Sequence, residues 1–203
     1  MRANTDVEAT VIPNTVDTVR FTPQSIAHER FTFVSACNLI PVKNMAGLLC
    51  AFAALDGEPR LVIFGDGAER ASLQNLAETE GVSDRVEFRG HCCREELAEA
   101  YALADCFVLA SRSETFGVAY IEAMASGLPV IATRCGGPDD FVTEENGILI
   151  PVDDESTLTG AMEHMMLRRE DYDSAAISAD IRRKFAPETI AARLTELYEG
   201  VLS

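Results

Sequence analysis

The sequence predicts an α/β fold in which helices cover both faces of a parallel sheet. Six short apolar or β-branched segments alternate with segments of helical periodicity. Turns that contain glycine, proline or asparagine separate many of these segments. Right-handed crossovers between such strands give a doubly wound layer. The expected architecture is therefore a Rossmann-like three-layer α/β/α sandwich with a six-stranded, mainly parallel sheet.

The expected strands are short and rich in apolar and β-branched side chains. In chain order they are Phe31–Ala36, Leu61–Phe64, Arg85–Phe88, Asp105–Ala110, Val130–Ala132 and Gly147–Ile150. Arg85–Phe88 alternates polar and apolar residues, which is typical of a half-buried strand. The other segments are nearly continuous apolar runs, as expected for a sheet that is covered on both faces.

Helices are expected in most intervals between the strands and at the end of the chain. They are Met45–Leu55, Ala68–Glu80, Arg94–Leu103, a helix from about Gly117, Glu155–Leu167, Ser174–Lys184 and Pro187–Leu202. Asp56–Pro59 stops the first helix and Gly81 ends the second. Pro187 suits the first turn of the last helix. Residues 1–30 are expected to be irregular, with a short apolar run at Val11–Ile12.

Length, charge and cysteine usage exclude several classes of protein. A chain of 203 residues is expected to form one domain, and it can bury roughly 70% of its unfolded surface without a disulfide or metal. A net charge of −16 argues against nucleic acid as a partner. No apolar run approaches the roughly 20 residues of a membrane helix, and no signal peptide is apparent. Six cysteines without a C-x-x-C pair indicate free thiols in the cytoplasm and no metal site.

The segment Ser111–Thr133 is the most specific motif in the chain. Glu114 and Glu122 have seven residues between them, and the backbone amides of Phe116–Val118 would form the open end of a helix. Gly117 lets the backbone approach a ligand closely. Glu122 is placed to accept hydrogen bonds from a ribose diol. The alternative is an amphipathic helix whose first acidic residue is favoured by the helix dipole.

A second candidate is the loop Cys37–Asn44, which follows the first expected strand. Lys43 and Lys184 are the only lysines in the chain. Because the net charge repels a diphosphate at long range, such a ligand needs local donors. Lys43 could bind it as a point charge, and Asn38 could donate an uncharged amide proton. The alternative for Lys43 is a solvated loop residue.

Glycine turns follow the next two expected strands. Gly65-Asp66-Gly67 resembles part of a dinucleotide fingerprint, but Arg70 stands where the third glycine or alanine belongs. This turn is expected to line the ligand cleft. Gly90 could offer backbone groups to a nucleobase edge. We interpret His91 as a loop histidine because no partner for it can be read from the sequence.

Several segments together resemble the C-terminal half of family 4 (group 1) retaining glycosyltransferases of the GT-B type. They are Val11–Phe21, the Lys43 loop, Leu61–Gly67, Ala104–Leu109, the paired glutamates and Asn146–Pro151. The resemblance implies one half of a GT-B fold. Residues 1–30 would be an interdomain linker or N-terminal extension, and residues 31–203 a donor-binding domain ending in helices. The acceptor-binding N-terminal domain would be absent, so the fragment alone is expected to be inactive.

The resemblance also implies a function. The full-length enzyme would transfer a hexose from a UDP-, GDP- or ADP-sugar to a glycan or lipid-linked acceptor, with retention of configuration and without a cofactor. It would be cytoplasmic, with peripheral attachment to the inner membrane face as one arrangement, and would serve polysaccharide biosynthesis. A nucleotide-sugar epimerase domain and a non-catalytic nucleotide-binding or interaction domain remain open alternatives.

By position in the motif, Glu114 would contact the donor sugar at the catalytic centre. Lys43 would bind the diphosphate and Glu122 the ribose. The family usually has an arginine where Asn38 stands, and its loss removes a charge-assisted hydrogen bond of roughly 1.5–3 kcal/mol. The donor-binding candidates are Asn38, Lys43, Gly65, Asp66, Gly90, Thr115, Phe116, Gly117, Val118 and Glu122.

Overall fold

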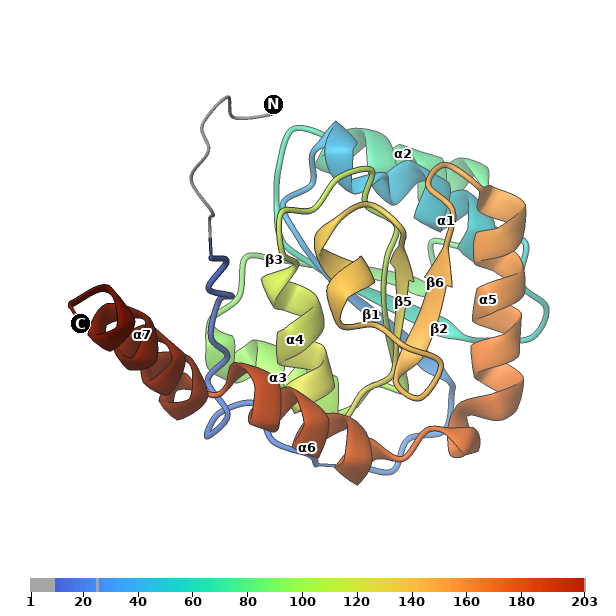
Figure 1. The fold of residues 1–203 in the computed structure, drawn as a ribbon. Coiled ribbons are helices and arrows are strands. Elements are labelled where there is room, and N and C mark those ends of the chain that lie inside the picture. The colour runs from blue at the N-terminus through green and yellow to red at the C-terminus, as the bar shows by residue number, and fades with distance from the viewer. Residues whose placement is uncertain (1–9, 25, 203) are drawn as a thin grey trace.

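The computed structural model describes residues 10–24 and 26–202, and it has the predicted layered α/β architecture (Figure 1). Its sheet has six strands in the order β3-β2-β1-β4-β5-β6, and every neighbouring pair is parallel. The strand order reverses between β1 and β4. In sheets of this kind the loops diverge at such a switch point and leave a crevice beyond the carboxyl ends of the strands.

All six predicted strands are present, with shifts of one or two residues at their ends. They are β1 (Thr32–Ala36), β2 (Arg60–Phe64), β3 (Val86–Gly90), β4 (Cys106–Leu109), β5 (Val130–Thr133) and β6 (Gly147–Ile150). The interior strands β4 and β5 are buried at every position, because helices cover both of their faces.

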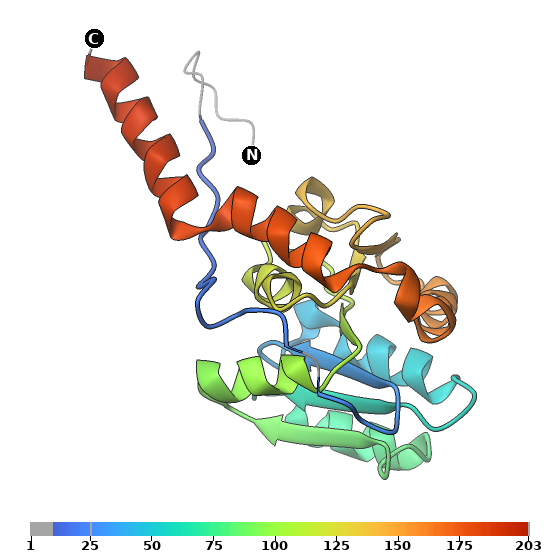
Figure 2. The ribbon, with the colours of Figure 1, turned by 90° about the horizontal axis from the view of Figure 1, so that it is seen from below.

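The predicted helices are also present. They are α1 (Met45–Ala53), α2 (Arg70–Thr79), α3 (Arg94–Ala102), α4 (Val118–Ala125), α5 (Glu155–Arg168), α6 (Ser174–Phe185) and α7 (Pro187–Leu202). Helix α1 packs against α2 and α5, while α4 packs against α6 on the other face of the sheet (Figures 1 and 2). Helix α7 projects away from this body. The 3-10 turns η1 (Pro41–Lys43), η2 (Gly137–Asp140) and η3 (Arg169–Asp171) were not predicted.

Side-chain caps explain where three of the helices begin. The Cys93 thiol accepts from the backbone N of Glu96 at 3.5 Å, and the Glu96 carboxylate accepts from the backbone N of Cys93 at 2.8 Å. This capping box starts α3. Asp154 and Asp173 accept backbone N–H groups in the first turns of α5 and α6.

Part of the segment before β1 packs on the domain. Val16 and Phe21 are buried, and the Phe21 ring lies 5.9 Å from that of Tyr101 on α3. The Val16 backbone N donates to the Phe185 carbonyl at 3.0 Å. Residues 1–9 and 25 of the predicted linker lie outside the described residues, and the domain boundaries stay a prediction. None of the helices described is long and apolar enough to cross a membrane.

An ion pair ties this segment to the start of β4 and should make stability depend on pH. His28 Nε2 lies 2.7 Å from Asp105 Oδ2, and its Nδ1 lies 2.8 Å from the Ile26 carbonyl. Partial burial lowers the pKa of His28, but hydrogen bonds to Asp105 and Ile26 and the charge of Asp105 raise it overall. A group whose pKa is higher in the folded than in the unfolded state stabilises the fold fully at pH values below its unfolded-state pKa. This stabilisation is lost as the pH rises through the folded-state pKa.

We therefore expect His28→Gln to lower the melting temperature more at about pH 5.5 than at about pH 8.5. His164→Gln on the exposed face of α5 is the control and should show no such difference. Thermal unfolding of both variants and the wild type at the two pH values measures the effect. An equal loss at both pH values for His28→Gln would show that the imidazolium does not stabilise the fold.

Candidate functional site

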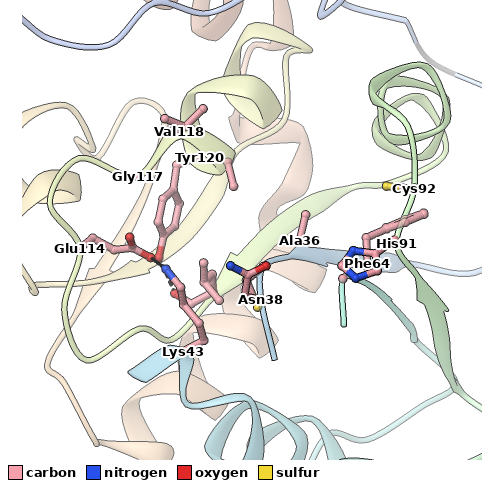
Figure 3. Close-up of a pocket in the computed structure, with 14 residues that line it drawn as sticks. Ala36, Asn38, Lys43, Phe64, His91, Cys92, Glu114, Gly117, Val118 and Tyr120 are labelled. Atoms are coloured by element: carbon pink, nitrogen blue, oxygen red, sulfur yellow. Dashed lines mark hydrogen bonds and ion pairs between the residues drawn. The ribbon is translucent and has the colours of Figure 1, made fainter. Parts of the chain in front are cut away.

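A cavity of about 380 Å³ lies beyond the carboxyl ends of the strands, where the strand order reverses (Figure 3). The loops after β1, β2, β3 and β4 and the first turn of α4 form its wall. The lining residues are Ala36, Cys37, Asn38, Lys43, Phe64, Gly65, His91, Cys92, Leu109, Glu114, Gly117, Val118, Ala119 and Tyr120. The structure thus brings together six of the candidate residues, namely Asn38, Lys43, Gly65, Glu114, Gly117 and Val118.

An ion pair between Lys43 and Glu114 lies in this cavity. Lys43 Nζ is 2.7 Å from Glu114 Oε1, and the Ser111 hydroxyl donates to the same oxygen at 2.8 Å. The side chains of Lys43 and Glu114 are only 19% and 11% exposed. The two residues come from different loops and point toward each other in Figure 3. Partial exclusion of water strengthens their attraction, so the cavity holds a firmly placed cation in a strongly acidic chain.

The N-terminus of α4 forms the opposite wall. Gly117 caps this helix with a φ of 97°, and Val118, Ala119 and Tyr120 of the first turn line the cavity. A Cβ at position 117 would lie 2.8 Å from the Tyr120 ring, so glycine suits both the backbone conformation and the space. The positive end of the helix dipole therefore faces the same space as the Lys43 ammonium.

The glycine turn after β2 is hydrogen-bonded to the end of β3. The Gly65 backbone N donates to the Gly90 carbonyl at 2.7 Å, so Gly90 supports the wall although it is not among the lining residues. The Asp66 carboxylate accepts from Gly67 N at 2.7 Å and from Arg70 Nη1 at 3.0 Å. Asp66 is also not among the lining residues, because its side chain stabilises the turn that begins α2.

Glu122 has a different environment from Glu114. Its carboxylate is nearly buried on α4 and lies 3.8 Å from the exposed Arg94 guanidinium. Burial raises the pKa of Glu122, although the charges of Arg94 and Arg20 oppose the shift. Glu122 is not among the residues that line the cavity, whereas Cys92 is. Burial raises the pKa of the Cys92 thiol, and the charge of Glu122 adds to this shift. In this structure, therefore, Glu122 does not itself form part of the cavity wall.

Thr115 and Phe116, two further candidates, are likewise not among the lining residues. The Phe116 ring packs at 5.7 Å from Phe141 and 5.5 Å from Phe185. Phe116 therefore anchors the loop between Glu114 and Gly117 to the hydrophobic core.

Some lining residues were missed or left aside in the sequence. His91 is a loop histidine, as interpreted, and its ring lies at the cavity wall. Cys37 lines the cavity too, and burial raises the pKa of its thiol to about 12, which keeps it protonated and unreactive. Tyr120 is fully buried and donates its hydroxyl proton to the Leu109 carbonyl at 2.7 Å. Their position directly after strands or in the first turn of α4 is the signal that could have identified them.

No cluster of three or more histidine, cysteine or acidic side chains suited to a metal ion occurs within residues 10–24 and 26–202. The candidate site thus consists of a lysine, a glutamate, a helix N-terminus and close backbone turns. Together with the doubly wound sheet, it defines a Rossmann-like α/β domain with a polar ligand crevice at its switch point.

Comparison with known proteins identifies the family. The chain belongs to the glycosyl transferases group 1, whose family model matches residues 18–181. It is 41% identical to a GDP-mannose-dependent alpha-mannosyltransferase of Mycobacterium tuberculosis, over 73% of this chain and 38% of that protein. It is 30% identical to a GDP-mannose-dependent alpha-(1-6)-phosphatidylinositol monomannoside mannosyltransferase of the same species, over 93% of this chain and 55% of that protein.

Among solved structures, a sucrose-phosphate synthase from Thermosynechococcus elongatus superposes with a TM-score of 0.87 at 27% identity. That match covers 94% of this chain and 52% of the synthase. The chain therefore spans about two fifths to just over half the length of these relatives. The predicted family and the GT-B-type Rossmann-like fold are confirmed, and the comparisons do not favour the epimerase alternative.

Proposed function

We propose that this chain is the donor-binding half of a retaining glycosyltransferase that transfers mannose from GDP-mannose. The observation that carries the proposal is the Lys43–Glu114 pair opposite the N-terminus of α4, in a cavity at the switch point. The cavity volume of about 380 Å³ lies within the usual range for small-ligand sites. The GDP-mannose dependence of the relatives supports the choice of donor, and UDP- and ADP-sugars are the alternatives.

The cavity supports a specific placement of the donor. The diphosphate would lie between the Lys43 ammonium and the first turn of α4, because these are the positive groups on its wall. The sugar would then lie beside Glu114. The nucleoside would extend past Gly65 toward His91, with its ribose near Glu122.

This placement implies an exchange of partners at Glu114. Before the donor binds, Lys43 and Ser111 both occupy its Oε1. A bound diphosphate would compete for the Lys43 ammonium, and Glu114 would then accept hydrogen bonds from sugar hydroxyls. Glu114 thereby holds the donor rather than acting as an acid or base. The acceptor oxygen would bond to the anomeric carbon as the bond to the diphosphate breaks, and its proton would pass to the leaving phosphate.

The acceptor would be a glycan or a lipid-linked sugar bound mainly by a second domain of the full-length enzyme. The lipid-linked alternative is supported by the phosphatidylinositol mannoside named for one relative. Peripheral attachment to the inner membrane face would bring such an acceptor within reach. Without that second domain, the chain should bind a donor but not catalyse transfer.

Calorimetric titration of the chain with GDP, UDP and ADP tests the proposal. We expect GDP to bind at least severalfold more tightly than the other two nucleotides. The expected preference for GDP rests on the relatives, and diphosphate binding itself rests on Lys43 and α4. A folded sample that binds none of the three at millimolar concentration would contradict the donor-binding function. Tightest binding of UDP or ADP would contradict only the choice of GDP-mannose.

A further inference from the structure

Arg112 links three turns of the chain without lining the cavity. Its Nε donates to Asp153 Oδ1 at 2.7 Å, its Nη1 to the Pro41 carbonyl at 2.6 Å and its Nη2 to Asn44 Oδ1 at 2.9 Å. Its backbone N donates to the Val42 carbonyl at 2.7 Å. Through these contacts one side chain joins the loop after β4, the turn η1 and the loop after β6.

Arg112 contacts residues on both sides of Lys43 in the chain. Pro41 and Val42 precede the lysine and Asn44 follows it, and all three accept a hydrogen bond from Arg112. The backbone of η1 is itself tight, because Lys43 N donates to the Ile40 carbonyl at 2.9 Å. Arg112 also lies next to Ser111, which holds Glu114. It therefore ties the loop that carries the cation of the site to the loop that carries its carboxylate.

Two residues that Arg112 contacts have an unusual backbone conformation. In the described part of the chain, Asn44 and Asp153 are the non-glycine residues with positive φ, at 49° and 55°. Asparagine and aspartate adopt this left-handed conformation more readily than other residues, but it stays unfavourable and persists where the surroundings hold it. Both side chains accept from the guanidinium of Arg112. A planar guanidinium can satisfy three acceptors at once, which a lysine ammonium cannot do with the same geometry.

We propose that Arg112 is a positioning residue, which holds Lys43 in place for the diphosphate of the donor without touching the ligand. This role rests on the proposed function, in which Lys43 binds the diphosphate. A direct contribution of the Arg112 charge is the competing explanation. It is disfavoured because Arg112 is not among the lining residues and its charge is paired with Asp153.

A double-mutant cycle on the 203-residue chain separates these explanations. We expect Arg112→Ala to weaken GDP binding about fivefold to tenfold and to leave guanosine binding nearly unchanged. In a Lys43→Ala background the same substitution should have little further effect, because the residue through which it acts is gone. Arg112→Lys keeps the charge but loses the planar fork, so it should behave like Arg112→Ala.

Amide hydrogen exchange gives a readout that needs no nucleotide. Without Arg112, the amides of Lys43 and Asn44 should exchange faster, while that of the buried Phe52, further along α1, should not change. Arg169→Ala is the matched control, because Arg169 also makes three side-chain hydrogen bonds, to Asp105, Tyr172 and Ser174 at the other end of the sheet. Its loss should lower stability without weakening GDP binding to the folded fraction.

Several outcomes would overturn the positioning role. One such outcome is that the Arg112→Ala variant binds GDP as tightly as the wild type does. If the alanine variant does not fold, the same result for Arg112→Lys would count instead. Another is an equal loss of affinity in the wild-type and Lys43→Ala backgrounds, which would indicate direct action on the ligand. If the wild type itself binds no nucleotide, the donor-binding function fails. The exchange of the Lys43 and Asn44 amides then still decides whether Arg112 holds this turn, and unchanged exchange would refute it.

Discussion

The Lys43→Ala variant should bind GDP about tenfold or more weakly than the wild type, with nearly unchanged affinity for guanosine. A hydrogen bond to a charged group contributes about 1.5–3 kcal/mol, which corresponds to roughly a tenfold to hundredfold change in affinity. The effect should be large here because the chain carries a net charge of −16 and its side chains provide few other cations at the cavity. Calorimetry with both ligands measures the two affinities.

Lys184→Ala is the matched control for this experiment. Lys184 is the other lysine of the chain, and it pairs with Asp180 on α6, so its loss changes the net charge equally. Repeating the comparison in a Glu114→Gln background removes the carboxylate that Lys43→Ala leaves without its cation. If Lys43→Ala and Lys184→Ala weaken GDP binding by the same factor, Lys43 has no specific role at the site.

The Gly65→Ala variant should lose more stability than an alanine substitution at a turn glycine with open space around its Cβ position. Gly65 has a φ of 117°, and a Cβ there would lie 1.8 Å from the carbonyl oxygen of Cys37. Backbone strain costs about 1–3 kcal/mol, and forcing atoms into a packed site costs about 1–3 kcal/mol more. We expect the free energy of unfolding to fall by about 2–6 kcal/mol in urea titrations.

Gly57→Ala separates these two costs. Gly57 also has a positive φ, 84°, but no atom lies within 4 Å of the position of its Cβ. We expect a loss of only about 1 kcal/mol there, from backbone strain alone. Because the loops of Gly65 and Cys37 both line the cavity, Gly65→Ala should also weaken GDP binding to the folded protein. Equal losses of stability in the two variants would show that the Gly65–Cys37 approach is not sterically limiting.

The regular elements were predictable because each has a local signal. β6 and α7 have the predicted ends, since Gly147 and Pro151 bound one and Pro187 starts the other. The turns η1 and η2 were not predicted, because three or four residues are too few to show helical periodicity. This matters for the site, since Lys43 lies in η1 and its direction depends on that turn.

The amino-acid sequence alone was enough to predict the family, the parallel α/β fold and the residues of highest interest, Lys43 and Glu114. Spacing within one segment encodes such motifs, so they can be read without coordinates. The three-dimensional structure was needed to show that Lys43 and Glu114 form one ion pair and that Asp66 stabilises a turn instead of lining the cavity. The structure also shows that Glu122 does not line the cavity and that Arg112 bonds the residues on either side of Lys43. These contacts join loops far apart in the chain, and the strand order of the sheet, rather than any local pattern, brings those loops together.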